Sequence, residues 1–245
     1  MLVTVGMNAF SRATKLGSVL GLFLVSVSGQ AAPPVAQQDD AAFEQFYQRV
    51  LQIRQDTTRH HETLVFAPDA TEVATDGVRF LGEWDRQEWG SSDSPNGDIV
   101  FLIGHLEADP TRHEMSKFHG MIKWATSSGF RAVMDPAALD QELDEVVQSA
   151  NTAVIIWSSH GSKDGRVYDA RENPIDNDSF SKGATSKLKM YVLSNCFGDQ
   201  TTKYYSFAPD STRIHWSGTT NSNELFEYLY SSRFDLNLRS LGFSI

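Results

Sequence analysis

Cysteine is the scarcest reactive side chain in this sequence, with one thiol, Cys196, among 245 residues. A single cysteine excludes an internal disulfide, so a fold of this length must rely on an apolar core. The H-E-x-x-H zinc pattern, a glycine-rich phosphate loop and the G-x-S-x-G turn of serine hydrolases are also absent. The sequence therefore carries no standard signature of a metalloprotease, a nucleotide-binding protein or a serine hydrolase.

The sequence also contains fewer basic than acidic residues. The chain has 21 Lys and Arg against 31 Asp and Glu, which gives a formal net charge of −10 and a pI of about 5.1. Nucleic acids and anionic membranes attract basic surfaces, so this balance argues against either as the main partner. Acidic charge favours solubility but does not identify a substrate.

The first 31 residues contain no acidic side chain. Arg12 and Lys15 precede a short apolar run at 16–28, and small residues follow at Ala31 and Ala32. This order predicts a cleavable signal peptide over residues 1–31 and a secreted or periplasmic protein without a membrane anchor after cleavage. The alternatives are an uncleaved anchor and a core helix, but the run is short for a bilayer span.

Two regions of different pattern follow the signal. Residues 32–97 combine a helical pattern at 41–58 with short strand patterns, and a loop of Ser, Asp, Pro, Asn and Gly at 91–97 closes the region. The strand patterns lie at 64–66, 78–81 and 83–89. We expect this region to be an N-terminal extension, acting either as a propeptide over the active site or as a structural addition.

From residue 98 onward, strand and helix patterns alternate. The strands are predicted at 99–103, 130–134, 153–157, 189–193 and 213–216, the helices at 114–128, 138–150 and 222–231, and a hairpin at 165–168. Apolar runs without alternation indicate strands buried on both faces. The prediction is an α/β fold with a mainly parallel sheet flanked by helices.

Chemistry-bearing residues directly follow the predicted parallel strands. His160 follows the strand at 153–157, and Cys196 follows the strand at 189–193. Parallel strands end at one edge of the sheet, where ligands bind, and neighbouring strands lie about 4.8 Å apart. A thiol and an imidazole on neighbouring loops can therefore meet.

A cysteine beside a histidine provides a nucleophile and its base. We predict Cys196 as the nucleophile, His160 as the general base, and the N–H groups of Gly161 and Cys196 as oxyanion donors. A helix beginning after Cys196, at 197–206, would also favour the thiolate. The alternative is a buried thiol and a histidine that never meet, and His105 is a rival base because it ends the first strand.

Three segments resemble caspase-like cysteine peptidases, the group of caspases, legumain, gingipains and clostripain. They are V-I-I-W-S-S-H-G-S-K-D-G at 154–165, M-Y-V-L-S-N-C-F-G at 190–198 and R-I-H-W-S-G-T-T-N-S at 213–222. The first looks most like legumain and its bacterial relatives, and T-R-H-E at 111–114 is similar to the start of legumain's first helix. The resemblance covers about residues 98–240.

The resemblance implies a three-layer caspase-like domain over residues 98–245 that cleaves peptide bonds through a thioester. It gives Arg112 and Ser217 as substrate-binding residues and implies cleavage after Asn or Asp. The chain departs from the family at Asn195 and Phe197, beside the cysteine. A catalytically inactive caspase-like module that binds peptides or partner proteins is the alternative.

Other candidate signals carry less weight. His60 and His61 are adjacent and face different directions, so we expect no metal and no cofactor. His113 and His119 are further alternative bases near the same edge. The aspartates between His160 and Cys196 are expected to be solvated loop charge rather than a calcium site.

Overall fold

The computed structural model describes residues 40–52, 86–104 and 112–245, without the side chains of residues 112–114. All of these residues belong to one compact unit, residues 35–245. The predicted signal peptide, the strand patterns at 64–66 and 78–81, and His60, His61 and His105 lie outside the described residues.

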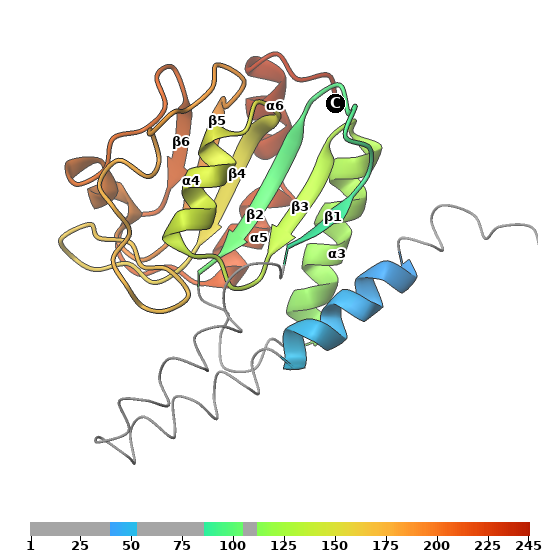
Figure 1. The fold of residues 1–245 in the computed structure, drawn as a ribbon, viewed down its shortest axis with the longest axis horizontal. Helices are drawn as coiled ribbons and strands as arrows, with labels where there is room; N and C mark the ends of the chain where they lie inside the picture. Colours follow the sequence, from blue (N-terminus) through green and yellow to red (C-terminus); the bar gives the residue numbers. More distant parts are fainter. Residues whose placement is uncertain (1–39, 53–85, 105–111) are drawn as a thin grey trace, which may run out of the picture. The chain divides into compact units, whose positions relative to one another are not determined.

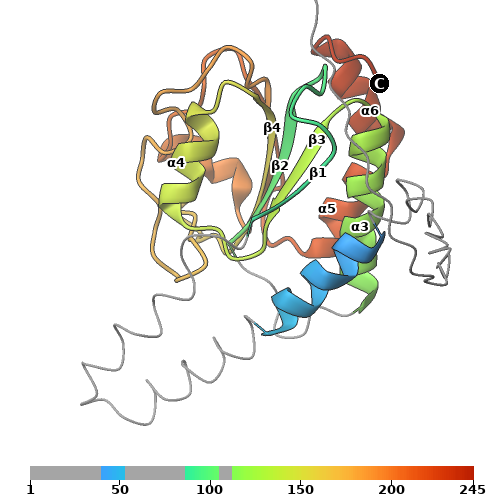
Figure 2. The same ribbon diagram turned by 45° about the vertical axis from the view of Figure 1, so that its right-hand side comes forward.

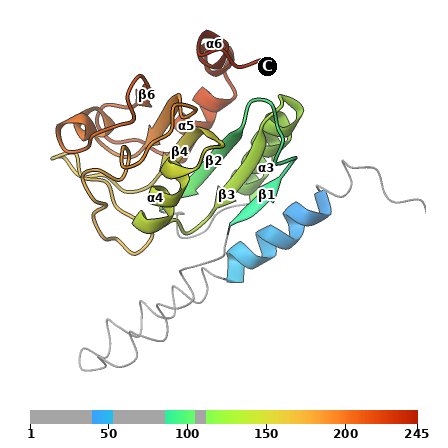
Figure 3. The same cartoon turned by 45° about the horizontal axis from the view of Figure 1, so that its top comes forward.

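A six-stranded sheet lies at the centre of the described unit (Figure 1). Its strands are β1 (Gln87–Trp89), β2 (Asp98–Ile103), β3 (Arg131–Asp135), β4 (Thr152–Ser158), β5 (Met190–Ser194) and β6 (Thr212–His215). They lie in the order β1-β3-β2-β4-β5-β6, and all neighbours are parallel except β1 and β3. Figure 3 shows β6 and β1 at opposite edges of the sheet.

Helices cover both faces of this sheet. They are α3 (Arg112–Ser127), α4 (Asp140–Gln148), α5 (Ser222–Leu229) and α6 (Ser232–Ser240). Figure 2 shows α4 on one side of the sheet and α3, α5 and α6 on the other. This arrangement confirms the predicted α/β fold with a mainly parallel sheet and is compatible with a three-layer architecture.

The central strands are apolar because both of their faces are covered. In β2, Ile99 and Phe101 belong to the apolar cluster on the side of α3, whereas Val100 and Leu102 belong to the cluster on the side of α4. All six residues of β2 are buried. Covering both faces removes the alternation of polar and apolar residues that an exposed strand face would show.

Residues 40–52 are helical and share the core of the sheet domain. Phe43, Phe46 and Val50 lie in the same apolar cluster as Trp89 of β1 and residues of α3. Phe43 also stacks on the His119 ring, with the ring centres 4.2 Å apart. The described parts of the predicted N-terminal extension thus contribute to the core, and a propeptide role stays a prediction.

The predicted strands and helices from residue 98 onward agree with the structure to within one or two residues at most ends. Helix α6 was not predicted, because Phe234 and Leu238 are its only buried apolar residues and form a weak periodic signal. Helix 197–206 is present only as a 3₁₀ helix, η2 (Gly198–Lys203). None of the helices in the described part of the chain has the length and apolar character needed to cross a membrane.

Candidate active site

The loops that carry His160 and Cys196 leave neighbouring strands at the same level. Ser158 of β4 is paired with Ser194 of β5, and His160 and Cys196 each lie two residues beyond their strand's member of this pair. The Ser159 N–H donates to the Ser194 carbonyl at 3.1 Å, which continues the pairing past the strand ends. The sheet therefore places both residues at its carboxyl edge.

Gly161 brings the two loops into contact. A Cβ atom at this position would lie closer than 3.0 Å to the Cys196 carbonyl oxygen and 2.7 Å from Asn195 Nδ2. Cβ atoms essentially never come that close to other atoms, so only glycine fits between the histidine and the cysteine loop. Residue 161 is a glycine because the backbone after His160 lies directly against the Cys196 carbonyl and the Asn195 side chain.

A hairpin holds the His160 loop in place, where one was predicted. The Ser162 N–H donates to the Arg166 carbonyl at 2.9 Å, and the Tyr168 N–H donates to the His160 carbonyl at 3.2 Å. Gly161 faces Val167 between these two bonds, so its own N–H points away from the hairpin. Within residues 40–52, 86–104 and 112–245, no group accepts a hydrogen bond from the N–H of Gly161 or of Cys196.

The segment after Cys196 pairs with the loop that follows β6. The Phe197 N–H donates to the Gly218 carbonyl at 2.5 Å, and the Asp199 N–H donates to the Trp216 carbonyl at 3.1 Å. Phe197 adopts the left-handed conformation with φ of 57°, which is rare for a bulky side chain. This backbone turn leaves Cys196 partly exposed.

The Cys196 thiol contacts the loop before α5. Its Sγ lies 3.8 Å from the Thr220 carbonyl oxygen, which accepts the S–H hydrogen bond. Thr220 Oγ1 in turn donates to Glu224 Oε2 at 2.6 Å. A thiol is a weak hydrogen-bond donor, so this contact can orient the Cys196 side chain.

Of the remaining predicted residues, Ser217 lies near the cysteine loop and His119 does not. Ser217 is exposed between the two carbonyl groups that pair with the cysteine loop, those of Trp216 and Gly218. Arg112 is the first residue of α3, and its side chain lies outside the described residues. His119 instead faces the helix at 40–52, where its Nε2 lies 3.2 Å from an Asp40 oxygen.

No role was predicted for Asn195, but the structure places it beside Cys196 and Gly161. Its side chain is buried, with 1% of the residue exposed, and its Nδ2 donates to the Cys196 carbonyl at 3.1 Å. Its Oδ1 is buried and has no hydrogen-bond partner in the described part of the chain. A polar residue that directly follows a buried strand was the available signal.

A carboxyl pair at the end of β3 was also missed. Burial raises the pKa of Asp135 and, together with the adjacent Asp135 carboxyl, raises the pKa of Glu142 to about 7. Asp135 Oδ1 accepts from the Ala137 N–H at 3.0 Å, and Asp135 Oδ2 is buried without a hydrogen-bond partner in the described part of the chain. The pair was missed because its members come from β3 and α4 and meet only in the folded chain.

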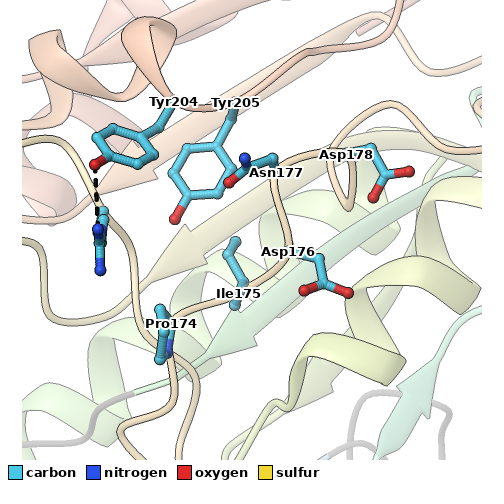
Figure 4. A pocket seen from close by; sticks show the side chains of 8 residues that line it. Pro174, Ile175, Asp176, Asn177, Asp178, Tyr204 and Tyr205 are labelled. Carbon is cyan, nitrogen blue, oxygen red and sulfur yellow. Dashed lines mark hydrogen bonds between the residues drawn. The ribbon is translucent and has the colours of Figure 1, made fainter.

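A cavity of about 500 Å³ lies beside the hairpin that follows His160, and neither His160 nor Cys196 lines it (Figure 4). Its walls are Arg166, residues 174–178, Tyr204 and Tyr205. Arg166 Nη2 donates to Tyr204 Oη at 3.3 Å, and the guanidinium lies over the Tyr204 ring, 5.2 Å from its centre. The cavity thus combines a cation, aromatic rings and the carboxylates of Asp176 and Asp178.

Comparisons with protein-family models, with curated proteins and with solved structures find no match for this chain. In the described ranges, no group of three His, Cys, Asp or Glu side chains is arranged to hold a metal ion. The residues and geometry of the strand-end loops are therefore the basis for assigning a function.

Proposed function

We propose that this protein is a caspase-like cysteine endopeptidase in which Cys196 is the nucleophile and His160 the general base. One observation carries the proposal: Gly161 lies directly on the backbone of Cys196, at the carboxyl edge of a parallel sheet. This contact makes His160 and Cys196 members of two touching loops. Ligands bind at this edge in open α/β sheets.

The proposed reaction begins when His160 takes the Cys196 thiol proton and the sulfur attacks the carbonyl carbon of the scissile peptide. The carbonyl oxygen becomes an anion that the N–H groups of Gly161 and Cys196, which donate to no backbone carbonyl of the described residues, can stabilise. The C–N bond then breaks, and the imidazolium returns the proton to the leaving amine. Water, activated by His160, hydrolyses the resulting thioester and regenerates the thiol.

The conformation around Cys196 supports a functional role. Phe197 is held in a left-handed conformation, and Asn195 keeps a buried oxygen without a donor. Each feature costs about 1–3 kcal/mol, and such costs cluster at active sites. A cysteine that served only as a small buried hydrophobe would need neither of them.

The sequence resemblance suggests the substrate, and the signal pattern suggests the location. The substrate would be a protein or peptide, with cleavage after Asn or Asp, and Arg112 and Ser217 would contact the side chain before the cleaved bond. No cofactor takes part in the proposed reaction. The signal pattern at 1–31 supports a secreted or periplasmic enzyme.

Labelling with an active-site probe tests the proposal. Peptidyl acyloxymethyl ketones carrying Asn, Asp or Arg beside the reactive group would be added to the purified protein, to Cys196→Ala and to His160→Ala. We expect labelling that requires both residues and is fastest with Asn or Asp, because the probe needs a positioned thiolate. Mass spectrometry of the labelled peptide would locate the modified residue.

The labelling experiment can also refute the proposal. If Cys196 reacts no faster than a free thiol and His160→Ala changes nothing, the peptidase proposal fails. The chain would then be better described as a caspase-like module that binds peptides or partner proteins. Binding of the same peptides without cleavage, measured by calorimetry, would support that alternative.

A further inference from the structure

Asn195 directly precedes the proposed nucleophile and is one of the most deeply buried polar residues of the described chain. With 1% of its surface exposed, it lies beneath Gly161, whose added Cβ would meet both Asn195 Nδ2 and Asn195 Cβ. An asparagine at this depth is unusual unless its polar atoms are paired. Among the described residues, only its Nδ2 has a hydrogen-bond partner and its Oδ1 has none, which calls for an explanation.

The orientation of the amide follows from its surroundings. Asn195 Nδ2 donates to the Cys196 carbonyl at 3.1 Å. The flipped amide would place Oδ1 against this carbonyl oxygen, where two acceptors would repel each other. The buried, unpaired Oδ1 is therefore the cost of placing a donor on the Cys196 carbonyl.

This donor completes a clamp on the peptide that links Cys196 to Phe197. Asn195 holds the carbonyl oxygen of that peptide, and the Gly218 carbonyl accepts its N–H at 2.5 Å. The backbone of Gly161 closes the carbonyl side of the same peptide. With both polar atoms of the peptide held, the backbone from which the Cys196 side chain projects has a fixed orientation.

We propose that Asn195 is a positioning residue, which uses its amide to hold the Cys196 carbonyl and so sets the direction of the thiol relative to the His160 loop. The inference rests on the proposed function, since it assigns a role within the same site. Asn195 acts through Cys196 and does not itself touch the reacting atoms. A loss of positioning of about 1 Å is enough to slow a reaction by about 100-fold.

The test compares Asn195→Leu with Asn96→Leu, a matched change of a buried asparagine at the other end of the sheet. Asn96 donates to the Ser128 and Ser244 carbonyls at 2.8 Å each and accepts from the Ser244 N–H. Alkylation of Cys196 by iodoacetamide would be followed from about pH 5 to about pH 10, where thiolate formation sets the rate. Urea unfolding would be measured on the same samples.

We expect Asn195→Leu to slow alkylation by about tenfold or more and to move the midpoint of its pH profile. The urea midpoint should change little, because the variant loses one hydrogen bond and also one unpaired buried oxygen. Asn96→Leu should do the reverse, lowering the urea midpoint and leaving the pH profile unchanged. If the two variants differ only in stability and share the wild-type profile, Asn195 has a structural role and the inference is overturned.

Two further variants separate the remaining cases. If leucine unfolds the chain, Asn195→Ser, which keeps a donor, should retain more of the wild-type profile than Asn195→Ala, and equal profiles would overturn the inference. His160→Ala is measured alongside them. If His160→Ala has the wild-type pH profile of alkylation, the Cys196–His160 dyad is refuted. If His160→Ala changes the profile and the Asn195 variants do not, only the positioning role is refuted.

Discussion

At the amino edge of the sheet, where β2 and β3 begin, the buried side chains of Asn96 and Asp98 have hydrogen-bond partners and Trp89 Nε1 has none among the described residues, whereas at the carboxyl edge the unpaired atoms lie beside Cys196. Asn96 uses its amide in three hydrogen bonds, and Arg131 Nε donates to Asp98 Oδ1 at 3.0 Å. At the other edge, Asn195 Oδ1 and Asp199 Oδ1 are buried without a hydrogen-bond partner among the described residues.

The difference in hydrogen bonding shows which edge of the sheet stabilises the fold and which edge carries features that destabilise it. Paired polar groups at the amino edge hold β2, β3 and the C-terminal residues together. The carboxyl edge keeps unpaired atoms, a left-handed Phe197 and two facing acids, all of which disfavour folding. A chain retains such features where they serve a ligand or a reaction. The two edges should therefore respond differently to substitution.

The largest expected effect is at the amino edge. Arg131→Ala leaves Asp98, whose side chain is 4% exposed, without its cation, which should lower the free energy of unfolding by about 3–5 kcal/mol. Urea unfolding measures the loss. Lys182→Ala, which removes an exposed ion pair to Asp144, is the control and should leave the unfolding midpoint unchanged. The rate of Cys196 alkylation in the folded Arg131 variant should match the wild-type rate. A slower rate would show that the two edges of the sheet are not independent.

Gly161→Ala should have the next largest effect, on reactivity. The new Cβ forces the His160 loop away from Cys196, so labelling by the peptidyl probe should slow by about 100-fold, or about 2.7 kcal/mol of barrier. Gly242→Ala is the control: a Cβ there meets nothing within 4 Å, and its φ of 91° makes alanine cost stability without changing the labelling rate. Comparable labelling rates for the two variants would contradict the contact on which the proposed site depends.

The carboxyl pair predicts a pH dependence of stability. Burial and Asp135 raise the pKa of Glu142 to about 7 from an ordinary value of 4.5, while Arg86 opposes the shift of both acids and Arg49 that of Asp135. The folded chain therefore holds a proton that the unfolded chain releases. The stabilisation is complete below about pH 4.5 and is lost as the pH rises to about 7.

Glu142→Gln removes this titration. The variant should gain about 1–2 kcal/mol relative to wild type between about pH 5 and about pH 8, after allowance for the partial exposure of Glu142. Urea unfolding at several pH values checks this. Glu145→Gln, an exposed residue of the same helix that lies 3.8 Å from Arg86, should keep the wild-type slope. Parallel curves for wild type and Glu142→Gln would show that the acids do not interact.

The smallest expected effect tests a well-paired part of the carboxyl edge. Asn221 caps α5, accepting from the N–H groups of Asn223 and Glu224 at 2.9 and 3.3 Å. Asn221→Ala should lower the free energy of unfolding by about 1 kcal/mol and change Cys196 alkylation by less than about threefold. Asn221→Ser, which keeps a capping oxygen, should restore most of the stability. A large loss of reactivity would mean that the cap and the site are coupled through Thr220.

Much of the fold was predictable because its signals are local. The apolar runs that became β2, β4 and β5 differ plainly from the helical patterns between them, and their ends agree with the structure to within one or two residues. Helix α6 and the antiparallel position of β1 were not predicted. Strand β1 contributes three residues, and nothing in so short a segment indicates which strand it pairs with.

The order of residues alone determined that His160, Gly161 and Cys196 follow parallel strands, because crossover connections bring every strand end to one edge. The contacts between these residues and their neighbours depend on the tertiary structure. Three features could not be read from the sequence: the contact of Asn195 with Gly161, the pairing of Phe197 with the loop after β6, and the Asp135–Glu142 pair. Each joins residues from different elements or depends on local backbone angles. Such contacts follow from strand register and close packing, which no periodicity in the sequence records.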